Sequence, residues 1–329
     1  MVARPAGAAV RGSAVRWPPL ARRSALALAV VAALAVVGPL LCQPPDAISD
    51  PAATALLAPG SRRLVLTLAD GTTLAAEQAV QVGGDWEIRR LGKLRAVPGG
   101  DVRGVESRRY WLGTDALGRD VLARLLWGGR VSLALGLLAL AVSTLLGAAV
   151  GLAASWVGGA VDATLMRLAD AVLAVPMLVL VLLLTALLRP SLGVLAVVIG
   201  LGSWMGVARL MRAQVQALKQ RDFVLGLRAI GASPARILLR HIVPNTLAPL
   251  GQDAALRLGD LILIESSLSF LGFGVQPPAA SWGSLLADGQ AALGSGWWLV
   301  VFPGCLLAAT VLAAALLAEG LQERLRHLR

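Results

Sequence analysis

The stretch RDFVLGLRAIGASPARILLRHIVPN, residues 221–245, lies between two apolar stretches of the chain. It mixes basic and apolar residues and is too polar to cross a bilayer, which takes about 20 mostly apolar residues. It is also too regularly patterned for an unstructured linker. The sequence predicts a segment at one membrane surface, held either by another protein or by lipid headgroups that bind its arginines.

The spacing within this segment predicts two short helices. A helix over 221–231 places Phe223, Leu227 and Ile230 on one face. Gly231 is suited to end it, because glycine adopts left-handed backbone freely. Ser233-Pro234 is suited to begin the second helix, since proline is tolerated in a first turn. Pro244 restricts how the next apolar stretch leaves the segment, so the pattern predicts a lever that a partner could tilt.

The composition is that of a membrane protein. The chain is 57% apolar and 15% charged, with a mean hydropathy of +0.74, whereas soluble domains average roughly 45–50% apolar and about 25% charged. The net charge of +11 comes from arginine-rich segments between apolar stretches, so we expect no nucleic-acid partner. Cys42 and Cys305 show no disulfide or metal-site spacing, and we expect no metal site.

We predict six membrane-spanning helices, each close to the required length, at residues 24–41, 131–153, 168–188, 191–208, 246–268 and 297–318. The first follows Arg22-Arg23 and lacks a small-residue cleavage site, which favours an uncleaved anchor over a signal peptide. Arg189-Pro190 is predicted to form the tight turn between the third and fourth spans.

The distribution of Lys and Arg predicts the orientation. The tail 1–23, the loop 209–245 and the C-terminal tail are basic, whereas the loop 266–296 contains no Lys or Arg. With six spans, both termini and the loop 209–245 are therefore predicted to be cytoplasmic. The polar segment 42–110 then lies outside. Its alternating residues 63–69, followed by Asp70-Gly71, predict a β-hairpin in a small module, which either has no role or contacts an extracytoplasmic partner.

A polar motif follows the insertion, at Gly113, Thr114, Asp115, Gly118, Arg119 and Asp120. Thr114 or Asp115 can cap a helix, whose apolar face then contains Leu117, Val121, Leu122, Leu125 and Leu126. We expect this helix to lie on the outer membrane surface and then to turn into the second span.

The fifth predicted span carries charges. Asp253, Arg257 and Asp260 are spaced i, i+4 and i+7, and Glu265 follows. Charges within a bilayer normally face protein or water. This face either lines a polar translocation path, or holds a structural Asp253–Arg257 pair at an interface with a partner.

No phosphate-binding loop of the Gly-x-x-x-x-Gly-Lys-Ser/Thr type occurs, so we do not expect this chain to bind ATP in that manner. The charged fifth span could belong to a secondary transporter driven by an ion gradient. Such a transporter predicts inverted repeats in the sequence, and none is evident. A membrane-embedded hydrolase is disfavoured, because no nucleophile and base are paired in the sequence.

Four stretches of the chain carry a family resemblance. They are 112–133, from Leu-Gly-Thr-Asp to Arg-Val-Ser-Leu; 161–176, with Met-Arg-Leu-Ala-Asp; 231–245; and 265–289, with Glu-Ser-Ser-Leu-Ser-Phe-Leu-Gly and Ser-Trp-Gly. In this order they resemble the C-type permease subunits of bacterial ATP-binding-cassette (ABC) importers for dipeptides, oligopeptides and nickel. The resemblance covers most of residues 111–329 and does not extend equally to 43–110.

The resemblance implies a fold and a set of partners. The fold is an all-α, six-span type I importer permease (MetI-like), here with a small extracytoplasmic β insertion, in the bacterial inner membrane. The implied partners are a second permease, two ATPase subunits that bind ATP and Mg, an extracytoplasmic solute-binding protein and membrane lipid. We expect this chain to bind no cofactor itself and to catalyse no reaction.

The resemblance also implies that the ATPase docks on a coupling helix, at Asp222, Phe223, Leu227, Arg228, Gly231, Ala232, Ser233 and Pro244. The family signature there is a Glu-Ala-Ala triplet followed by a glycine and a proline. Gly231 and Pro244 match it, but the triplet reads Leu225-Gly226-Leu227. The acidic residue is therefore missing, and Asp222, one turn earlier, is the expected partial substitute.

Overall fold

The computed structural model describes residues 18–187 and 191–327, so the predicted Arg189-Pro190 turn and most of the tail 1–23 lie outside the described residues. The helices are α1 (Pro19–Leu41), α2 (Pro51–Thr54), α3 (Val121–Val157), α4 (Gly159–Leu173), α5 (Met177–Leu187), α6 (Leu192–Leu201), α7 (Trp204–Lys219), α8 (Asp222–Ala229), α9 (Pro234–Ile237), α10 (Val243–Phe270), α11 (Trp282–Gln290) and α12 (Trp298–His327). A π-helical turn, η2 (Leu238–Ile242), joins α9 to α10.

The segment between α2 and α3 forms two three-stranded antiparallel sheets. Their strands are β1 (Ser61–Leu68), β2 (Thr73–Ala76), β3 (Gln78–Val82), β4 (Asp85–Arg90), β5 (Lys93–Val97) and β6 (Val102–Tyr110), and the spatial orders are β2-β1-β6 and β3-β4-β5. A short 3-10 turn, η1 (Gly99–Asp101), precedes β6. β1 and β2 pair across the Asp70-Gly71 turn, where the Asp70 carboxylate accepts a hydrogen bond from the N–H of Thr72 at 2.8 Å. The buried residues between the sheets are Leu66, Ala76, Ile88 and Val97.

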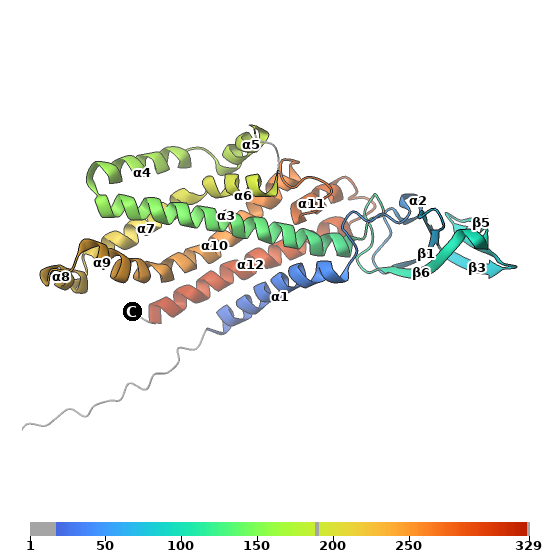
Figure 1. Ribbon diagram of the computed structural model, residues 1–329, viewed down its shortest axis with the longest axis horizontal. Helices are drawn as coiled ribbons and strands as arrows, with labels where there is room; N and C mark the ends of the chain where they lie inside the picture. The colour runs from blue at the N-terminus through green and yellow to red at the C-terminus, as the bar shows by residue number, and fades with distance from the viewer. Residues whose placement is uncertain (1–17, 188–190, 328–329) are drawn as a thin grey trace, which may run out of the picture.

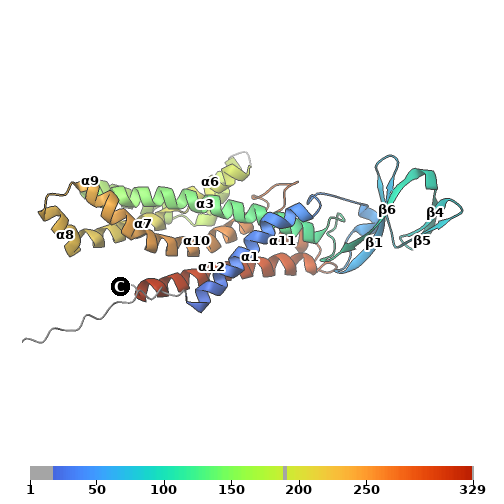
Figure 2. The same cartoon turned by 60° about the horizontal axis from the view of Figure 1, so that its bottom comes forward.

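The molecule is an elongated helical bundle with the β module at one end and α8 and α9 at the other (Figure 1). α1 and α10 run towards the β module, whereas α3 and α12 run away from it. A second view shows α1 lying across α12 (Figure 2). The end of α12 and the start of α1 therefore lie on the same side of the bundle as α8 and α9.

The longest helix, α3, corrects the predicted surface helix. It runs without interruption over 37 residues from Val121, or about 55 Å at the usual rise per residue. Its N-cap is Asp120, whose carboxylate accepts from the N–H of Leu122 at 2.8 Å, so Thr114 and Asp115 lie before the helix. The predicted turn into the second span is absent. Gly128 and Gly129 lie at this position, but they remain helical. They make room for the start of α11, because a Cβ on Gly129 would lie 3.0 Å from the Trp282 ring.

The third and fourth predicted spans are each broken. α4 and α5 meet at 85°, and α6 and α7 meet at 45°. Pro176 lies in the first break and explains it, because proline lacks the N–H for the helical ladder and disfavours helical backbone in the residue before it. Gly202 and Ser203 form the second break. α7 then continues to Lys219, so the predicted loop 209–245 is largely helical.

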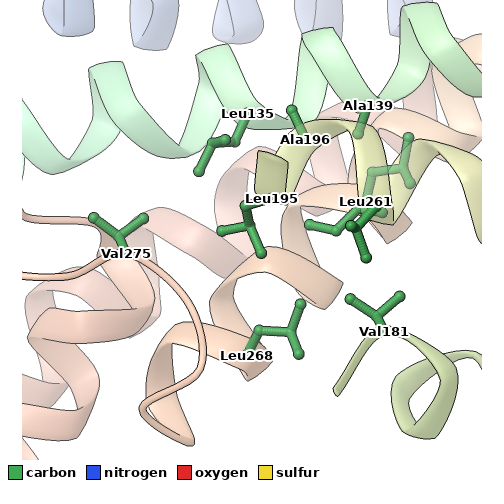
Figure 3. Close-up of a cluster of buried hydrophobic side chains, with 10 residues drawn as sticks. Leu135, Ala139, Val181, Leu195, Ala196, Leu261, Leu268 and Val275 are labelled. Carbon is green, nitrogen blue, oxygen red and sulfur yellow. The ribbon is translucent and has the colours of Figure 1, made fainter. Parts of the chain in front are cut away.

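The central core joins helices far apart in sequence. Figure 3 shows Leu135 and Ala139 of α3 beside Leu195 and Ala196 of α6, with Leu261 and Leu268 of α10 packed against them. Close approach of α3 and α7 depends on small residues. A Cβ on Gly151 would lie 2.3 Å from the carbonyl oxygen of Ala208, so any larger residue forces the two helices apart.

Three of the described helices, α1, α3 and α12, are long and apolar enough to cross a membrane, and the number rises to five if each bent pair is one span. α10, which contains the fifth predicted span, is not in that set. It carries Asp253, Arg257, Asp260 and Glu265, more charged residues than a membrane-spanning helix usually contains. The apolar helices place the chain among multi-pass membrane proteins, and six spans require α10 to cross as well.

Candidate functional site

The α8–α9 corner is fixed by backbone geometry at Gly231. This glycine has a φ of +78°, and nothing lies within 4 Å of a Cβ placed there. Its N–H donates to the carbonyl of Arg228 at 3.0 Å, and the N–H of Ala232 donates to Leu227 at 3.0 Å. Ser233 then adopts extended backbone, and Pro234 begins α9. The glycine is required here for its left-handed conformation rather than for space.

One side of α8 packs on the bundle, and the apolar residues predicted to share a helical face do not all lie on that side. Val224 is fully buried against Met211 and Val215 of α7, with Leu227 beside it. Phe223 is 44% exposed and Ile230 is 79% exposed. The three predicted apolar residues therefore divide between the inner and the outer side of α8. The helix presents Phe223, Leu225 and Ile230 outward, together with the exposed Asp222 and Arg228.

α9, η2 and α10 follow one another without a break. Pro244 lies in the first turn of α10 and has no N–H to donate to the preceding turn. The π-helical turn η2 is located where that hydrogen bond is missing. Asn245 donates through its side-chain amide to the carbonyl of His241 at 2.6 Å. The α8–α9 corner is thus joined by continuous helix to residues deep in the bundle (Figure 1).

The first two charged residues of α10 form an ion pair at the break between α6 and α7. The Arg257 Nε donates to the Asp253 carboxylate at 2.5 Å, and the Arg257 Nη1 donates to the carbonyl of Ser203 at 3.2 Å. Both side chains of the pair are about three-quarters buried. A Cβ on Gly206 would lie 2.2 Å from the Arg257 guanidinium, so the absence of a side chain there admits the arginine.

The other two predicted residues of α10 lie apart from this pair. Asp260 is exposed. Glu265 is fully buried, and its carboxyl group accepts from the hydroxyl of Ser269 at 2.8 Å. Hydroxyls of Ser132 in α3 and Ser281 before α11 also interact with it. The four charges predicted as one set therefore divide into a pair, an exposed carboxylate and a buried link between α3, α10 and α11.

The polar motif before α3 binds the chain that leads into the β module. Thr114 accepts a hydrogen bond from the N–H of Leu57 at 2.8 Å and donates to the carbonyl of Thr54. Gly113 has a φ of +80°, and its Cβ would lie 2.5 Å from the carbonyl oxygen of Leu57. Gly118 is equally constrained by Thr54. Burial raises the pKa of the Asp120 carboxyl although it accepts backbone hydrogen bonds.

Asp115 is the centre of an ion-pair network that the sequence did not predict. Its carboxylate accepts from Arg119 and from Arg124, each at 2.7 Å. Arg124 also donates to Asp288 of α11 at 2.7 Å. Asp115 and Arg124 are almost fully buried, whereas the Asp288 side chain is 44% exposed. Asp288 stands 164 positions after Arg124, so no local pattern indicated the contact.

A bundle of long apolar helices with a basic helical corner at one end and a polar module at the other is the architecture of a multi-pass membrane protein. The chain belongs to the family of binding-protein-dependent transport system inner membrane components, which matches residues 131–327. The matched region contains α8–α10 and begins after the β module and the Gly113–Asp120 motif.

Named relatives are transport permeases. The dipeptide transport system permease protein DppC of Bacillus subtilis (strain 168) is 38% identical over 67% of this chain and 69% of its own length. The oligopeptide transport system permease protein OppC of Haemophilus influenzae is 38% identical over 66% of this chain and 70% of its own. The inward-facing MetNI methionine ABC transporter has a similar fold, with a TM-score of 0.51 and 18% identity over 62% of this chain and 96% of the matched one.

Proposed function

We propose that this chain is the C-type permease subunit of an ATP-driven importer and that its substrates are dipeptides or oligopeptides. The named dipeptide and oligopeptide permeases support the substrate class. A nickel complex or another small solute is the alternative within the same family resemblance. A second permease would complete the pathway, and two ATPase subunits would supply the energy.

The observation that carries this proposal is the continuous helix from the α8–α9 corner into α10. The exposed residues Phe223, Leu225 and Ile230 leave apolar surface on α8 that an ATPase subunit can cover. A push on this surface is passed along α9 and η2 to Arg257, and from there to the break between α6 and α7. The corner is therefore suited to couple ATP hydrolysis to movement of the helices.

The orientation is part of the proposal. α8 and α9 lie at one end of the bundle, and the start of α1 and the end of α12 point towards that end (Figure 1). These segments carry an excess of Lys and Arg. The positive-inside rule then places this end in the cytoplasm and the β module outside. We propose that the β module, together with the segment 270–290 that ends in α11, receives a solute-binding protein.

We further propose that Asp253, Arg257 and the exposed Asp260 face the translocation path. Their opposite charges match the two ends of a zwitterionic peptide. A purely structural Asp253–Arg257 pair is the competing interpretation, and replacement of Asp260 together with that of Arg257 separates the two.

Co-purification tests the proposed coupling. The tagged chain is isolated in mild detergent with the products of its neighbouring genes, either as wild type or with Gly231→Asp and Asp222→Arg combined. We expect an ATPase and a second permease with the wild type, and loss of the ATPase alone with the double variant. Glu87→Arg on the exposed face of β4 is the control for an altered charge and is expected to retain both partners. A chain that purifies alone and transports in liposomes without ATP would instead establish a secondary transporter.

A further inference from the structure

A basic cleft lies between the α3–α4 corner and the α8–α9 corner. It has a volume of about 280 Å³ and is lined by Trp156, Lys219, Arg228, Ala232, Pro234 and Ile237. The lining residues come from α3, the end of α7, α8 and the start of α9. The cleft is therefore built by tertiary packing and lies where the coupling corner meets the ends of the long helices.

The cleft is positively charged. The Lys219 ammonium lies 5.4 Å from the centre of the Trp156 ring and donates to the carbonyl of Ser155 at 2.8 Å. An ammonium has three donors, so two remain for a ligand. Arg228 is exposed on α8 and adds a second cation. None of the lining residues is acidic.

The Asp162 carboxylate, which lies near Lys219, is already occupied. Asp162 lies within electrostatic range of the lysine, but both its oxygens accept hydrogen bonds from Arg212, at 2.5 and 2.6 Å. Within the described parts of the chain, no acidic residue lines the cleft beside Lys219 and Arg228, so the ligand that suits them is an anion.

We propose that this cleft binds the phosphodiester headgroup of an anionic phospholipid from the cytoplasmic leaflet. Basic pockets between helix ends on that side of a membrane recognise such headgroups, and tryptophan favours the interfacial depth. The surface beside Trp156 is apolar and exposed, since Val157 is 65% and Val161 is 42% accessible. This surface accommodates the acyl chains of a lipid. An acidic side chain of a protein partner has no such chains and would leave the surface uncovered.

The bound lipid joins two parts of the coupling machinery. Its phosphodiester contacts Arg228 on α8 and Lys219 at the end of α7, so it holds the α8–α9 corner against the bundle. The assignment rests on the proposed function for the placement of this corner in the cytoplasm. It goes beyond that function by making the corner's position depend on the lipid composition.

Native mass spectrometry of the delipidated full-length chain tests the site. We expect the wild type to take up one equivalent of phosphatidylglycerol, to take up no phosphatidylcholine, and to retain the lipid when inorganic phosphate is added. Lys219→Gln combined with Arg228→Gln is expected to weaken this uptake about 25-fold, because each basic residue beside an anionic lipid contributes roughly a factor of five. Arg236→Gln with Arg240→Gln is the matched control, since it removes two exposed charges from the same segment outside the cleft, and it is expected to bind as the wild type does.

Several results would overturn the proposal. Equal uptake of phosphatidylcholine, no uptake by the wild type, or equal weakening in the Arg236 and Arg240 control would reject a specific anionic site. Displacement by inorganic phosphate would assign the cleft to a free anion. Unchanged lipid uptake by the Lys219 and Arg228 variant, with loss of a co-purified ATPase, would assign the cleft to an acidic side chain of that partner. Because lipid uptake is read on the isolated chain, failure to recover any ATPase rejects the proposed function separately.

Discussion

The guanidinium of Arg257 donates to the carbonyl oxygen of Ser203 at 3.2 Å, across 54 positions of sequence. Ser203 lies where α6 and α7 meet at 45°, and a helix break frees backbone carbonyls that need new donors. Arg257 supplies one donor while it pairs with Asp253 through its Nε. One side chain thus connects the charged face of α10 to the bend, and movement of α10 cannot leave the bend unchanged.

Replacing Arg257 tests whether this connection serves transport. Arg257→Ala leaves Asp253 without its partner, so we expect the free energy of unfolding to fall by about 1–3 kcal/mol. Peptide uptake by the assembled transporter is expected to fall at least tenfold. Thermal unfolding in detergent and uptake into proteoliposomes are the measurements. Normal uptake by a normally assembled variant would reject a place for Arg257 on the translocation path.

Asp260→Asn separates a path from a packing role. Asp260 is exposed and one turn beyond Arg257, so its replacement is expected to leave stability within about 0.5 kcal/mol of wild type. If the charged face lines the path, uptake of a zwitterionic peptide still falls. If uptake is unchanged while Arg257→Ala loses stability, the Asp253–Arg257 pair is structural.

Arg124 is expected to be among the most sensitive positions for stability. Arg124→Leu leaves Asp115 buried beside a single remaining cation, Arg119. Removing one partner of a buried pair destabilises by about 3–5 kcal/mol, and the thermal midpoint in detergent should fall accordingly. Asp288→Asn is the comparison, because that carboxylate is 44% exposed, and its loss is expected to have a clearly smaller effect. Equal effects would place the main strength of the network at α11 instead.

The β module is expected to lose protection at low pH through Asp50. Burial opposes ionisation of this residue, but the Arg90 guanidinium and the N–H of Ala75 outweigh it and hold the pKa of the Asp50 carboxyl below its usual range. Because the folded-state pKa is the lower one, its stabilisation is complete above the unfolded pKa of about 3.9 and is lost as the pH falls through the folded value.

Hydrogen exchange of residues 61–110 in the full-length chain, measured from pH 7 to pH 3, tests this expectation. Wild-type protection should be level down to about pH 4 and then decline. Asp50→Asn removes the negative charge that pairs with Arg90 at 2.8 Å and should lower protection by about 1–3 kcal/mol at pH 7, with a flatter pH profile. A wild-type profile that matches the variant would remove Asp50 from the account of module stability.

Short sequence patterns predict those turns whose backbone conformation is determined by neighbouring residues. Asp70-Gly71 between alternating residues indicates the turn between β1 and β2, and Gly231 with Ser233-Pro234 indicates the α8–α9 corner. The bends were not predicted, because hydropathy averages over Pro176 and over Gly202, and apolar residues continue on both sides of each. The uninterrupted start of α3 depends on how Gly129 admits Trp282, which is a tertiary contact.

In the candidate site too, the sequence predicts contacts between residues close together in the chain but not contacts between distant helices. The i, i+4 spacing of Asp253 and Arg257 predicts a pair on one helical face, and the structure contains that ion pair. The sequence does not indicate that Arg257 contacts Ser203 and Gly206. These two residues lie at and just after the break between α6 and α7, far from Arg257 in the chain. Phe223 and Leu227 share a helical face by spacing alone, but α7 covers the side of α8 at Val224, and only the packed structure decides which residues remain outward.

Replacing each of two glycines, one within α8 and one at the α8–α9 corner, tests whether backbone geometry at the corner or the helix propensity of α8 matters for coupling. Gly231 has a φ of +78°, and Gly226 lies within α8, with nothing within 4 Å of a Cβ at either position. Gly231→Ala therefore meets no clash but places a side chain in left-handed backbone, which costs about 1–2 kcal/mol. Gly226→Ala instead favours the helix by about 1 kcal/mol. If the corner transmits force, Gly231→Ala should lower peptide-stimulated ATPase activity of the assembled transporter several-fold, whereas Gly226→Ala should maintain or raise it. Equal activity in the two variants would show that the rigid corner at Gly231 is not needed for coupling.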